Sequence, residues 1–530
     1  MPRTLKFLAL ATALSLAGWA WPLRAATPAN TLVIAKQIDD IITMDPGEAY
    51  ELSGEEVLTN VYDRIIRFES ATSAKMVPGV AESWSVADDG KTFTFKIRAG
   101  QKFQDGSPLT AEDCAFSLQR VILLDKTPAF LLTQLGWTKD NVRDLVKATD
   151  PLTLQFTTPV KFAPTLVESL MSANVASVVE KKAAMEHEQN NDLGNGWLKT
   201  NSAASGPFRL VSWKPNESVT LEANPGYREG PPTMRRVVIQ HVPEPSAQLL
   251  LVQKGDADIA RDLQPDQLVT LEGDKNVEVK TFPGSDTWYA AMNLSYEPFK
   301  NPKVREAMKY LIDYDGMADS FLKGRFFVHE GFLPHGFMGA LDENPYHLDV
   351  AKAKQLLTEA GYPNGFEVRM DSWNGAAMNS IIQSMQQTMA QAGVKMQIVP
   401  SDLKQVITTY RGRKHQMAAL SWGPDYFDPH TNADTFARNT NNADDAPTKP
   451  LAWRNHWLIP EISQETAAAA QEPDAAKRAA MYQDLQKKVL DQGPFLILFQ
   501  PYNQVAERTN VKNFAVGIFA DLTYYRTVTK

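Results

Sequence analysis

The chain has 530 residues and a formal net charge of −8, with 54 Lys and Arg against 62 Asp and Glu. Since single domains mostly span about 100–200 residues, we expect two or three domains. No dense run of Lys and Arg is present. Because phosphate neutralisation needs basic patches, the composition argues against a nucleic-acid-binding protein.

The N-terminus has the pattern of a secretory signal peptide. Arg3 and Lys6 precede the apolar stretch 7–20, and residues 23–25 (Leu-Arg-Ala) form a small-residue cleavage site. The apolar stretch is shorter than the ~20 residues of a membrane-spanning helix, so a membrane anchor is the less favoured interpretation. Cleavage after Ala25 removes three basic residues and takes the net charge from −8 to −11. We expect an exported protein.

Cys114 is the only cysteine. It can form no disulfide within the chain, belongs to no zinc or redox motif, and lies too far along the chain to carry an N-terminal lipid. No segment after the signal is apolar for long enough to cross a bilayer. We therefore expect a protein that is neither lipid-anchored nor membrane-embedded.

The first predicted elements alternate between strands and helices. Residues 31–35 predict a strand, and Ser53-Gly54-Glu55-Glu56 predicts a capping box before a helix whose apolar residues extend to Ile66. Residues 92–98 alternate as a strand, and Thr110 with Asp113 opens a helix through Val121.

The middle of the chain continues this mixture. Residues 206–223 predict a strand hairpin, 236–242 a strand, and 247–254 a helix that ends at a glycine. Asn301-Pro302 predicts a helix start, because proline is favoured in the first turn.

The segment from 350 to 400 is the most regular. It predicts helices over 351–360 and 377–391 and strands over 366–370 and 394–398. A strand, a helix and a strand within about 35 residues form a βαβ crossover, which requires a parallel sheet. The chain is therefore predicted to be α/β.

Sequence signatures of catalysis are missing. There is no G-x-S-x-G, Walker A, H-E-x-x-H or G-x-G-x-x-G motif, and no histidines pair closely at metal-ligand spacing. We expect a protein that is not an enzyme and that holds no cofactor or metal.

The densest candidate for function is the segment from Ser421 to His430. It follows a predicted buried strand over 417–420 and breaks at Gly-Pro, and ligands in open α/β sheets lie beyond the carboxyl ends of strands. Trp422 and Tyr426 would give flat apolar walls, and Asp425 would bind a cation or donor. The alternative is a turn in which Asp425 and a second aspartate cap backbone amides.

Two further candidates have equally open alternatives. His430 would be a ligand or metal contact, or simply a hydrogen-bonded histidine. Trp373 and Asn374 follow the strand over 366–370, where they suit either the lip of a pocket or a surface loop.

Two motifs resemble one known family. Residues 78–84 (P-G-V-A-E-S-W) and 105–113 (D-G-S-P-L-T-A-E-D) are similar to the family 5 extracellular solute-binding proteins. That family includes dipeptide-, oligopeptide- and nickel-binding proteins of ABC importers, and the resemblance covers nearly the whole mature chain. It implies a two-lobed periplasmic-binding-protein fold of type II, in the large class with an extra domain and with the ligand cleft between the lobes.

The resemblance also implies a division of the chain, with linkers near residues 285 and 500. The expected parts are a signal peptide over 1–25, a first lobe from 26–70, 201–285 and 498–530, an extra domain over 71–200, and a second lobe over 286–497.

The resemblance assigns roles in the site. In peptide-binding relatives an aspartate in a W-x-x-D segment binds the α-amino group of the ligand, and Trp422 and Asp425 match that segment. The arginines that hold a peptide carboxylate in relatives are missing, since one position is Ala419 and the loop at Trp373 has none. Arg261 would substitute, or the ligand lacks a free carboxylate.

Three remaining residues complete the expected site. Tyr50 and Glu51 are included as ligand-binding residues. His430, in an Asp-Pro-His sequence, is similar to the nickel-binding branch.

The favoured function is therefore a monomeric periplasmic substrate-binding protein of an ABC transporter. It would capture a short peptide or a related amine-bearing solute by hinge closure and deliver it to permease subunits in the membrane. The alternatives are a nickel-chelate receptor of the same fold and a secreted hydrolase.

Overall fold

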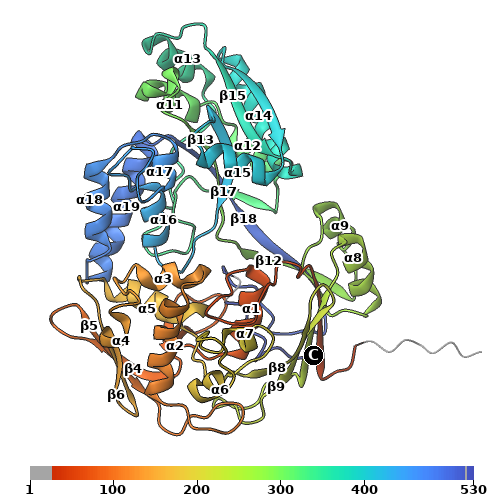
Figure 1. Cartoon of the computed structure of the whole chain (residues 1–530). Coiled ribbons are helices and arrows are strands. Elements are labelled where there is room, and N and C mark those ends of the chain that lie inside the picture. Colours follow the sequence, from red (N-terminus) through yellow and green to blue (C-terminus); the bar gives the residue numbers. More distant parts are fainter. Residues whose placement is uncertain (1–26, 520–521) are drawn as a thin grey trace, which may run out of the picture.

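The computed structural model describes residues 27–519 and 522–530. The predicted signal peptide and its cleavage site lie outside the described residues. Figure 1 shows two lobes that face each other, with one long strand, β18 (Phe495–Arg508), running from one into the other. No helix in the described ranges is both long enough and apolar enough to cross a membrane.

Twelve strands of the described residues form one mixed sheet that extends through both lobes, in the order β16-β15-β17-β13-β18-β11-β1-β10-β9-β8 with β12 and β14 also paired to β18. The strands of the first lobe are β1 (Thr31–Lys36), β8 (Phe208–Lys214), β9 (Ser218–Ala223), β10 (Arg236–His241), β11 (Ile259–Ala260) and β12 (Val277–Pro283). Those of the second lobe are β13 (Thr287–Met292), β14 (Phe326–Val328), β15 (Glu367–Trp373), β16 (Lys395–Ser401) and β17 (Met417–Trp422).

The strand β18 belongs to the sheets of both lobes. Its first residues pair with β13, and Tyr502–Arg508 pair with β12. A linker was expected near residue 500, and the backbone crosses there as an unbroken strand. The apolar pattern of β18 does not show where along the strand its partners change from one lobe to the other. The other crossing is the short segment 284–286 between β12 and β13.

A separate four-stranded unit packs beside the first lobe. It contains β4 (Ala81–Val86), β5 (Thr92–Ile97), β6 (Val146–Asp150) and β7 (Thr153–Thr157), in the order β4-β5-β7-β6, and a small pair, β2 (Ile66–Phe68) and β3 (Met76–Pro78), lies nearby. A buried ion pair ties this unit to the first lobe, since Arg120 donates to both carboxylate oxygens of Asp45 at 2.7 and 2.6 Å.

Helices cover the sheets. Those of the first lobe and the four-stranded unit are α1 (Leu52–Val61), α2 (Ala111–Leu124), α3 (Phe130–Thr133), α4 (Val142–Leu145), α5 (Pro164–Ser172), α6 (Lys181–Glu186), α7 (Asn195–Leu198), α8 (Pro245–Lys254) and α9 (Pro265–Thr270). Those of the second lobe are α10 (Glu297–Lys300), α11 (Pro302–Lys309), α12 (Tyr314–Asp319), α13 (Val350–Glu359), α14 (Ala376–Gln391), α15 (Leu403–Arg411), α16 (His430–Phe436), α17 (Leu451–Arg454), α18 (Pro460–Ala469) and α19 (Ala475–Gln492).

Local sequence signals placed several of these elements correctly. The capping box at Thr110 and Asp113 is present, with the Thr110 amide donating to the Asp113 carboxylate at 2.9 Å. The predicted βαβ crossover is confirmed, because β15 and β16 flank α14 and pair in parallel.

The predicted capping box at Ser53 is wrong. Helix α1 begins at Leu52 with Glu51 as its N-cap, and the Ser53 amide donates to Asp40 at 2.9 Å. The helix ends at Val61, and the apolar residues up to Ile66 belong to the following turn and to β2. The Asp40 carboxylate, from the loop before the helix, accepts a hydrogen bond from one of the free backbone amides of the first turn. Asp40 lies outside the four residues of a capping box, so the box pattern could not reveal it.

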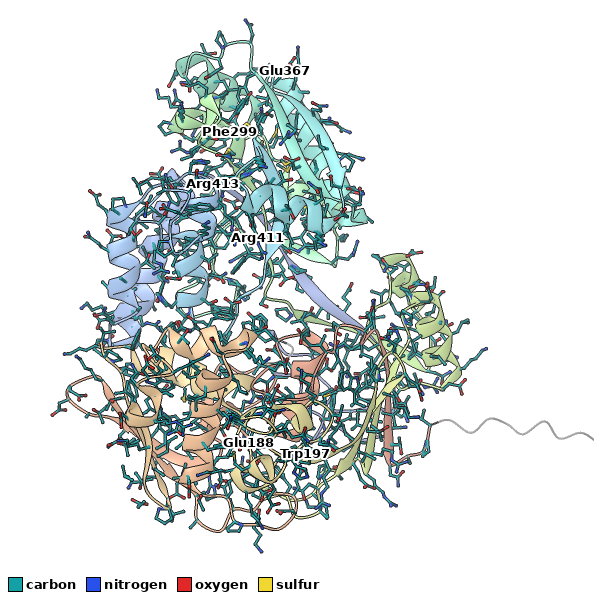
Figure 2. The ribbon with its side chains drawn as sticks, in the orientation of Figure 1. Glu188, Trp197, Phe299, Glu367, Arg411 and Arg413 are labelled. Carbon is teal, nitrogen blue, oxygen red and sulfur yellow. The ribbon has the colours of Figure 1, made fainter. Side chains whose placement is uncertain are left out.

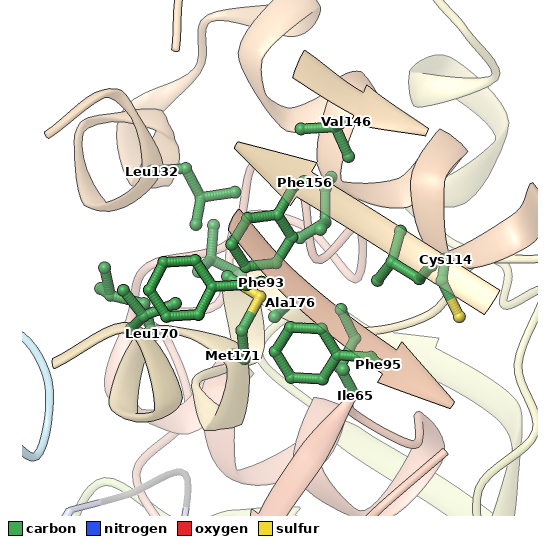
Figure 3. Packing of buried hydrophobic residues seen from close by; sticks show 14 of the residues in the cluster. Ile65, Phe93, Phe95, Cys114, Leu132, Val146, Phe156, Leu170, Met171 and Ala176 are labelled. Carbon is green, nitrogen blue, oxygen red and sulfur yellow. The ribbon is translucent and has the colours of Figure 1, made fainter. Parts of the chain in front are cut away.

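The core of the four-stranded unit is built around aromatic rings (Figure 3). Phe156 on β7 packs against Phe93 and Phe95 of β5 and against Trp137, with ring centroids 5.3, 5.4 and 5.0 Å apart. Leu170 and Met171 of α5 cover the same cluster. The fully buried Cys114 belongs to this core as a small apolar side chain.

We expect Phe156→Ala to destabilise the protein by about 3–5 kcal/mol, because it removes a fully buried ring and leaves a cavity among three others. Urea unfolding followed by circular dichroism measures the change. The matched control is Leu152→Ala in the preceding turn, where the side chain is 38% exposed and the loss should stay below about 1 kcal/mol. Equal losses in both variants would contradict this account of the core.

Candidate functional site

A cavity of about 600 Å³ lies between the two lobes. The first lobe contributes residues between Lys36 and Glu56, the four-stranded unit contributes residues between 169 and 175, and the second lobe contributes 423–427. The crossing segment 284–286 and residues 516–519 form the remaining walls. Its volume is in the usual range for sites that bind small molecules, about 300–1,000 Å³.

The strands of the second lobe aim their carboxyl ends at this cavity. Figure 2 places Glu367, the first residue of β15, at the end of the second lobe farthest from the first lobe, whereas Phe299 lies within that lobe. Strand β17 is parallel to β15, so it too ends toward the first lobe. The segment that follows β17 therefore lies in the ligand position expected for an open α/β sheet.

Asp425 carries the main polar contact across the cavity. Its Oδ1 accepts a hydrogen bond of 2.5 Å from the Tyr50 hydroxyl in the first lobe, and its Oδ2 accepts one of 3.3 Å from Thr431. Burial raises the pKa of Asp425, while these two hydrogen bonds oppose the rise. Both donors are neutral hydroxyls, so no cation compensates this carboxylate within the described part of the chain.

Other contacts across the cleft show that the lobes are closed on each other. The Tyr426 hydroxyl donates to Gln134 at 3.0 Å, and its ring joins the core of the four-stranded unit. Arg478 on α19 donates to the Thr165 hydroxyl at 2.8 Å. Phe427 also packs edge-on against a phenylalanine of β2, with centroids 5.1 Å apart.

A buried ion pair fixes the loop after β17. Arg478 donates to both carboxylate oxygens of Asp428 at 2.6 and 2.7 Å, and the two side chains are 0% and 2% exposed. The same carboxylate accepts from the His430 amide at 2.9 Å. Asp428 thus has the turn-capping role, whereas Asp425 faces the cavity.

The two basic side chains that line the cavity are already paired. Arg261 and Lys36 donate to the two oxygens of Glu56 at 2.7 and 2.6 Å, and the Tyr525 hydroxyl adds a third bond of 2.7 Å. Burial alone would raise the pKa of Glu56, but Arg261 and Lys36 lower it to about 2. Arg261 therefore contributes its charge to Glu56. An adjoining cavity of about 330 Å³ contains Arg325, for which the described residues offer no acidic partner.

The expected site residues divide into two groups. Asp425, Tyr426, Arg261 and Tyr50 line the cavity together. Glu51 lies just outside it as the N-cap of α1, where its carboxylate accepts from the Tyr50 amide at 3.2 Å.

The other aromatic and polar candidates lie away from the cavity lining. Trp373 packs against Trp288, with centroids 5.2 Å apart, and the Asn374 amide donates to a backbone carbonyl of β16 at 3.0 Å. Trp422 pairs across β13 and packs on the core of the second lobe. His430 lies 3.3 Å from the Tyr482 hydroxyl, and burial lowers its pKa.

Sequence reasoning missed Asp286, which lines the cavity from the crossing segment 284–286. It belongs to no motif, and only the expected boundary near residue 285 could have drawn attention to it. Over the described ranges, no group of three or more His, Cys, Asp or Glu side chains is arranged to hold a metal ion.

Two curated relatives are similar over most of their length. The probable D,D-dipeptide-binding periplasmic protein DdpA of Escherichia coli (strain K12) is 28% identical over 523 residues, which cover 97% of each chain. The glutathione-binding protein GsiB of Pectobacterium atrosepticum is 28% identical over 459 residues, which cover 86% of each chain.

Solved structures share the fold. HbpA2 from Haemophilus parasuis matches with a TM-score of 0.80 at 22% identity, over 94% of this chain and 99% of that one. DppA from Helicobacter pylori, in complex with the peptide STSA, matches with a TM-score of 0.73 at 24% identity, over 94% and 98%. The expected α/β, two-lobed periplasmic-binding-protein fold of type II is confirmed.

The family model for bacterial extracellular solute-binding proteins, family 5, matches residues 75–444. This match covers more than half of the chain and includes both motifs from which the resemblance was drawn. The chain belongs to the family 5 bacterial extracellular solute-binding proteins.

Proposed function

We propose that this chain is a periplasmic substrate-binding protein of an ABC transporter, which captures a short peptide or a related amine-bearing solute between its lobes. The observation that carries the proposal is Asp425, a carboxylate in the wall of the cavity between the lobes whose hydrogen-bond partners there are neutral. The relatives named for D,D-dipeptides and glutathione, and the neighbour with a bound peptide, support a peptide-like ligand.

The chemistry of Asp425 suits an ammonium group. A carboxylate that is partly removed from water binds a cation more strongly than an exposed one, because the effective dielectric is lower. Tyr50 comes from the opposite lobe, so a ligand held at Asp425 would contact both lobes at once. Closure would be stabilised only by the greater affinity of the closed state for the ligand.

We extend the proposal to the organisation of the chain. Residues 1–25 would be removed on export, the lobes and the extra domain would divide as the resemblance implies, and the mature monomer would deliver its ligand to permease subunits. A nickel-chelate receptor is less supported, since His430 is bonded within the second lobe and does not line the cavity.

Asp425→Asn keeps the shape of the side chain and removes its charge. We expect dipeptide affinity to fall about 10- to 150-fold, because a hydrogen bond to a charged group contributes about 1.5–3 kcal/mol. Isothermal titration with Ala-Ala measures the loss. Native mass spectrometry of protein purified from the periplasm without refolding should show peptide masses that the variant lacks.

Glu461→Gln is the control, because this exposed carboxylate on α18 does not line the cavity and its loss should change affinity less than twofold. Wild-type affinity in Asp425→Asn would remove Asp425 as the anchor. The proposed function would be overturned if no ligand copurified with the wild-type protein and if titration with peptides, amines and nickel all showed no binding.

We also propose that binding occurs without turnover. Peptide incubated with an excess of protein, then released by denaturation, should return with unchanged mass in liquid chromatography and mass spectrometry. Appearance of hydrolysed fragments that increase with time, at a rate above that of buffer alone, would instead support the secreted hydrolase.

A further inference from the structure

The cavity between the lobes is strongly acidic. Seven acidic side chains and two basic side chains line it, so its formal charge is −5 when all are ionised. Both basic side chains, Lys36 and Arg261, are bonded to the same carboxylate, Glu56. Neither of these two cations of the cavity wall is bonded to Asp425 or Asp286.

Asp286 is the most exceptional of these carboxylates. It lies on the crossing segment between β12 and β13, and within the described ranges its side chain has no hydrogen bond or ion pair. Its side chain is exposed, and the protein around the cavity raises its pKa through partial desolvation. The side chain remains accessible from the cavity. A carboxylate that is open to the cavity and has no partner among the described residues is free to bind a cationic group of the ligand.

Asp286 and Asp425 lie on the same wall of the cavity. Thr287 pairs with Trp422 across β13 and β17, so Asp286 and Gly423 continue this pair beyond the ends of the strands. The two residues are close, because a Cβ atom on Gly423 would lie 3.0 Å from Asp286 Oδ1. Asp425 follows two residues later. One wall thus presents two carboxylates of different origin, Asp286 from the crossing segment and Asp425 from the loop after β17.

An apolar surface lies beside these carboxylates. Phe427 and Phe519 both line the cavity, and their ring centroids are 5.7 Å apart in an edge-on arrangement. Such rings suit the aliphatic part of a ligand, whereas they offer nothing to a second anionic group.

We propose that Asp286 is a second cation subsite and that the ligand class is dicationic, with an ammonium at Asp425 and a second ammonium or guanidinium at Asp286. A short peptide with a lysine or arginine side chain has this chemistry. The inference rests on the proposed function, since it assumes that Asp425 holds the first amine. It adds a requirement for positive charge that a general peptide receptor does not have.

The test compares four dipeptides, Ala-Ala, Ala-Lys, Lys-Ala and Ala-Glu, by isothermal titration at constant salt. The wild-type protein should bind the better lysine dipeptide at least about 10-fold more tightly than Ala-Ala, and Ala-Glu most weakly. Asp286→Asn should reduce the lysine advantage to about twofold or less while Ala-Ala affinity stays within about twofold.

Two controls separate a specific subsite from a general effect of charge or folding. Glu278→Gln removes one negative charge from β12, outside the cavity lining, and should leave the lysine advantage intact. Thermal unfolding of ligand-free Asp286→Asn should give an unchanged Tm, because the exposed side chain makes no hydrogen bond or ion pair in the described residues that the variant would lose. Asp286→Ser provides a second variant with the same expectation.

The outcomes are distinguishable. If Ala-Ala and the lysine dipeptides bind equally, or if the lysine advantage survives in both Asp286 variants, the second subsite is wrong while the peptide-binding function stands. If the wild-type protein binds none of the four dipeptides and no peptide copurifies with it, the proposed function fails, and the inference fails with it.

Discussion

The buried ion pair between Asp428 and Arg478 is the interaction on which the binding face of the second lobe depends. Two charges removed from water are tolerated only when their geometry is good and their other hydrogen bonds are satisfied. Here the pair is bidentate, and the same arginine reaches Thr165 across the cleft. The loop after β17 is thereby held in one conformation. Asp425 and Tyr426 keep fixed positions because the neighbouring aspartate is fully committed to structure.

Charge is distributed unevenly around the cleft. Both basic side chains of the cavity wall form ion pairs with Glu56. The charge that the wall presents to a ligand is therefore negative. A receptor built in this way rejects anions through unfavourable like-charge contacts and does not need a steric block.

Local sequence patterns predicted the regular elements well and the site only in part. The capping box at Thr110 and the crossover over 366–398 depend on neighbours within a few residues, and both were found. Glu56 and Arg261 are 205 residues apart in the chain, and no spacing rule connects them. Trp373 was expected to suit a pocket lip as well as a surface loop, yet it packs against Trp288, because aromatic residues at strand ends can face either side of the sheet. Asp425 was predicted to be a ligand-binding residue both from the segment that follows a buried strand and from the family motif, and it does line the cavity.

The strand β18 has a consequence for the order of assembly. It is a central strand of the first lobe and of the second lobe, and it is encoded by residues 495–508 of 530. Each lobe therefore lacks a strand that pairs on both of its sides until β18 is available. Neither lobe can complete its part of the sheet before residues 495–508 are available. The two lobes therefore gain their last strand pairings together. They share one folding step, the pairing of β18, whichever part of the chain folds first.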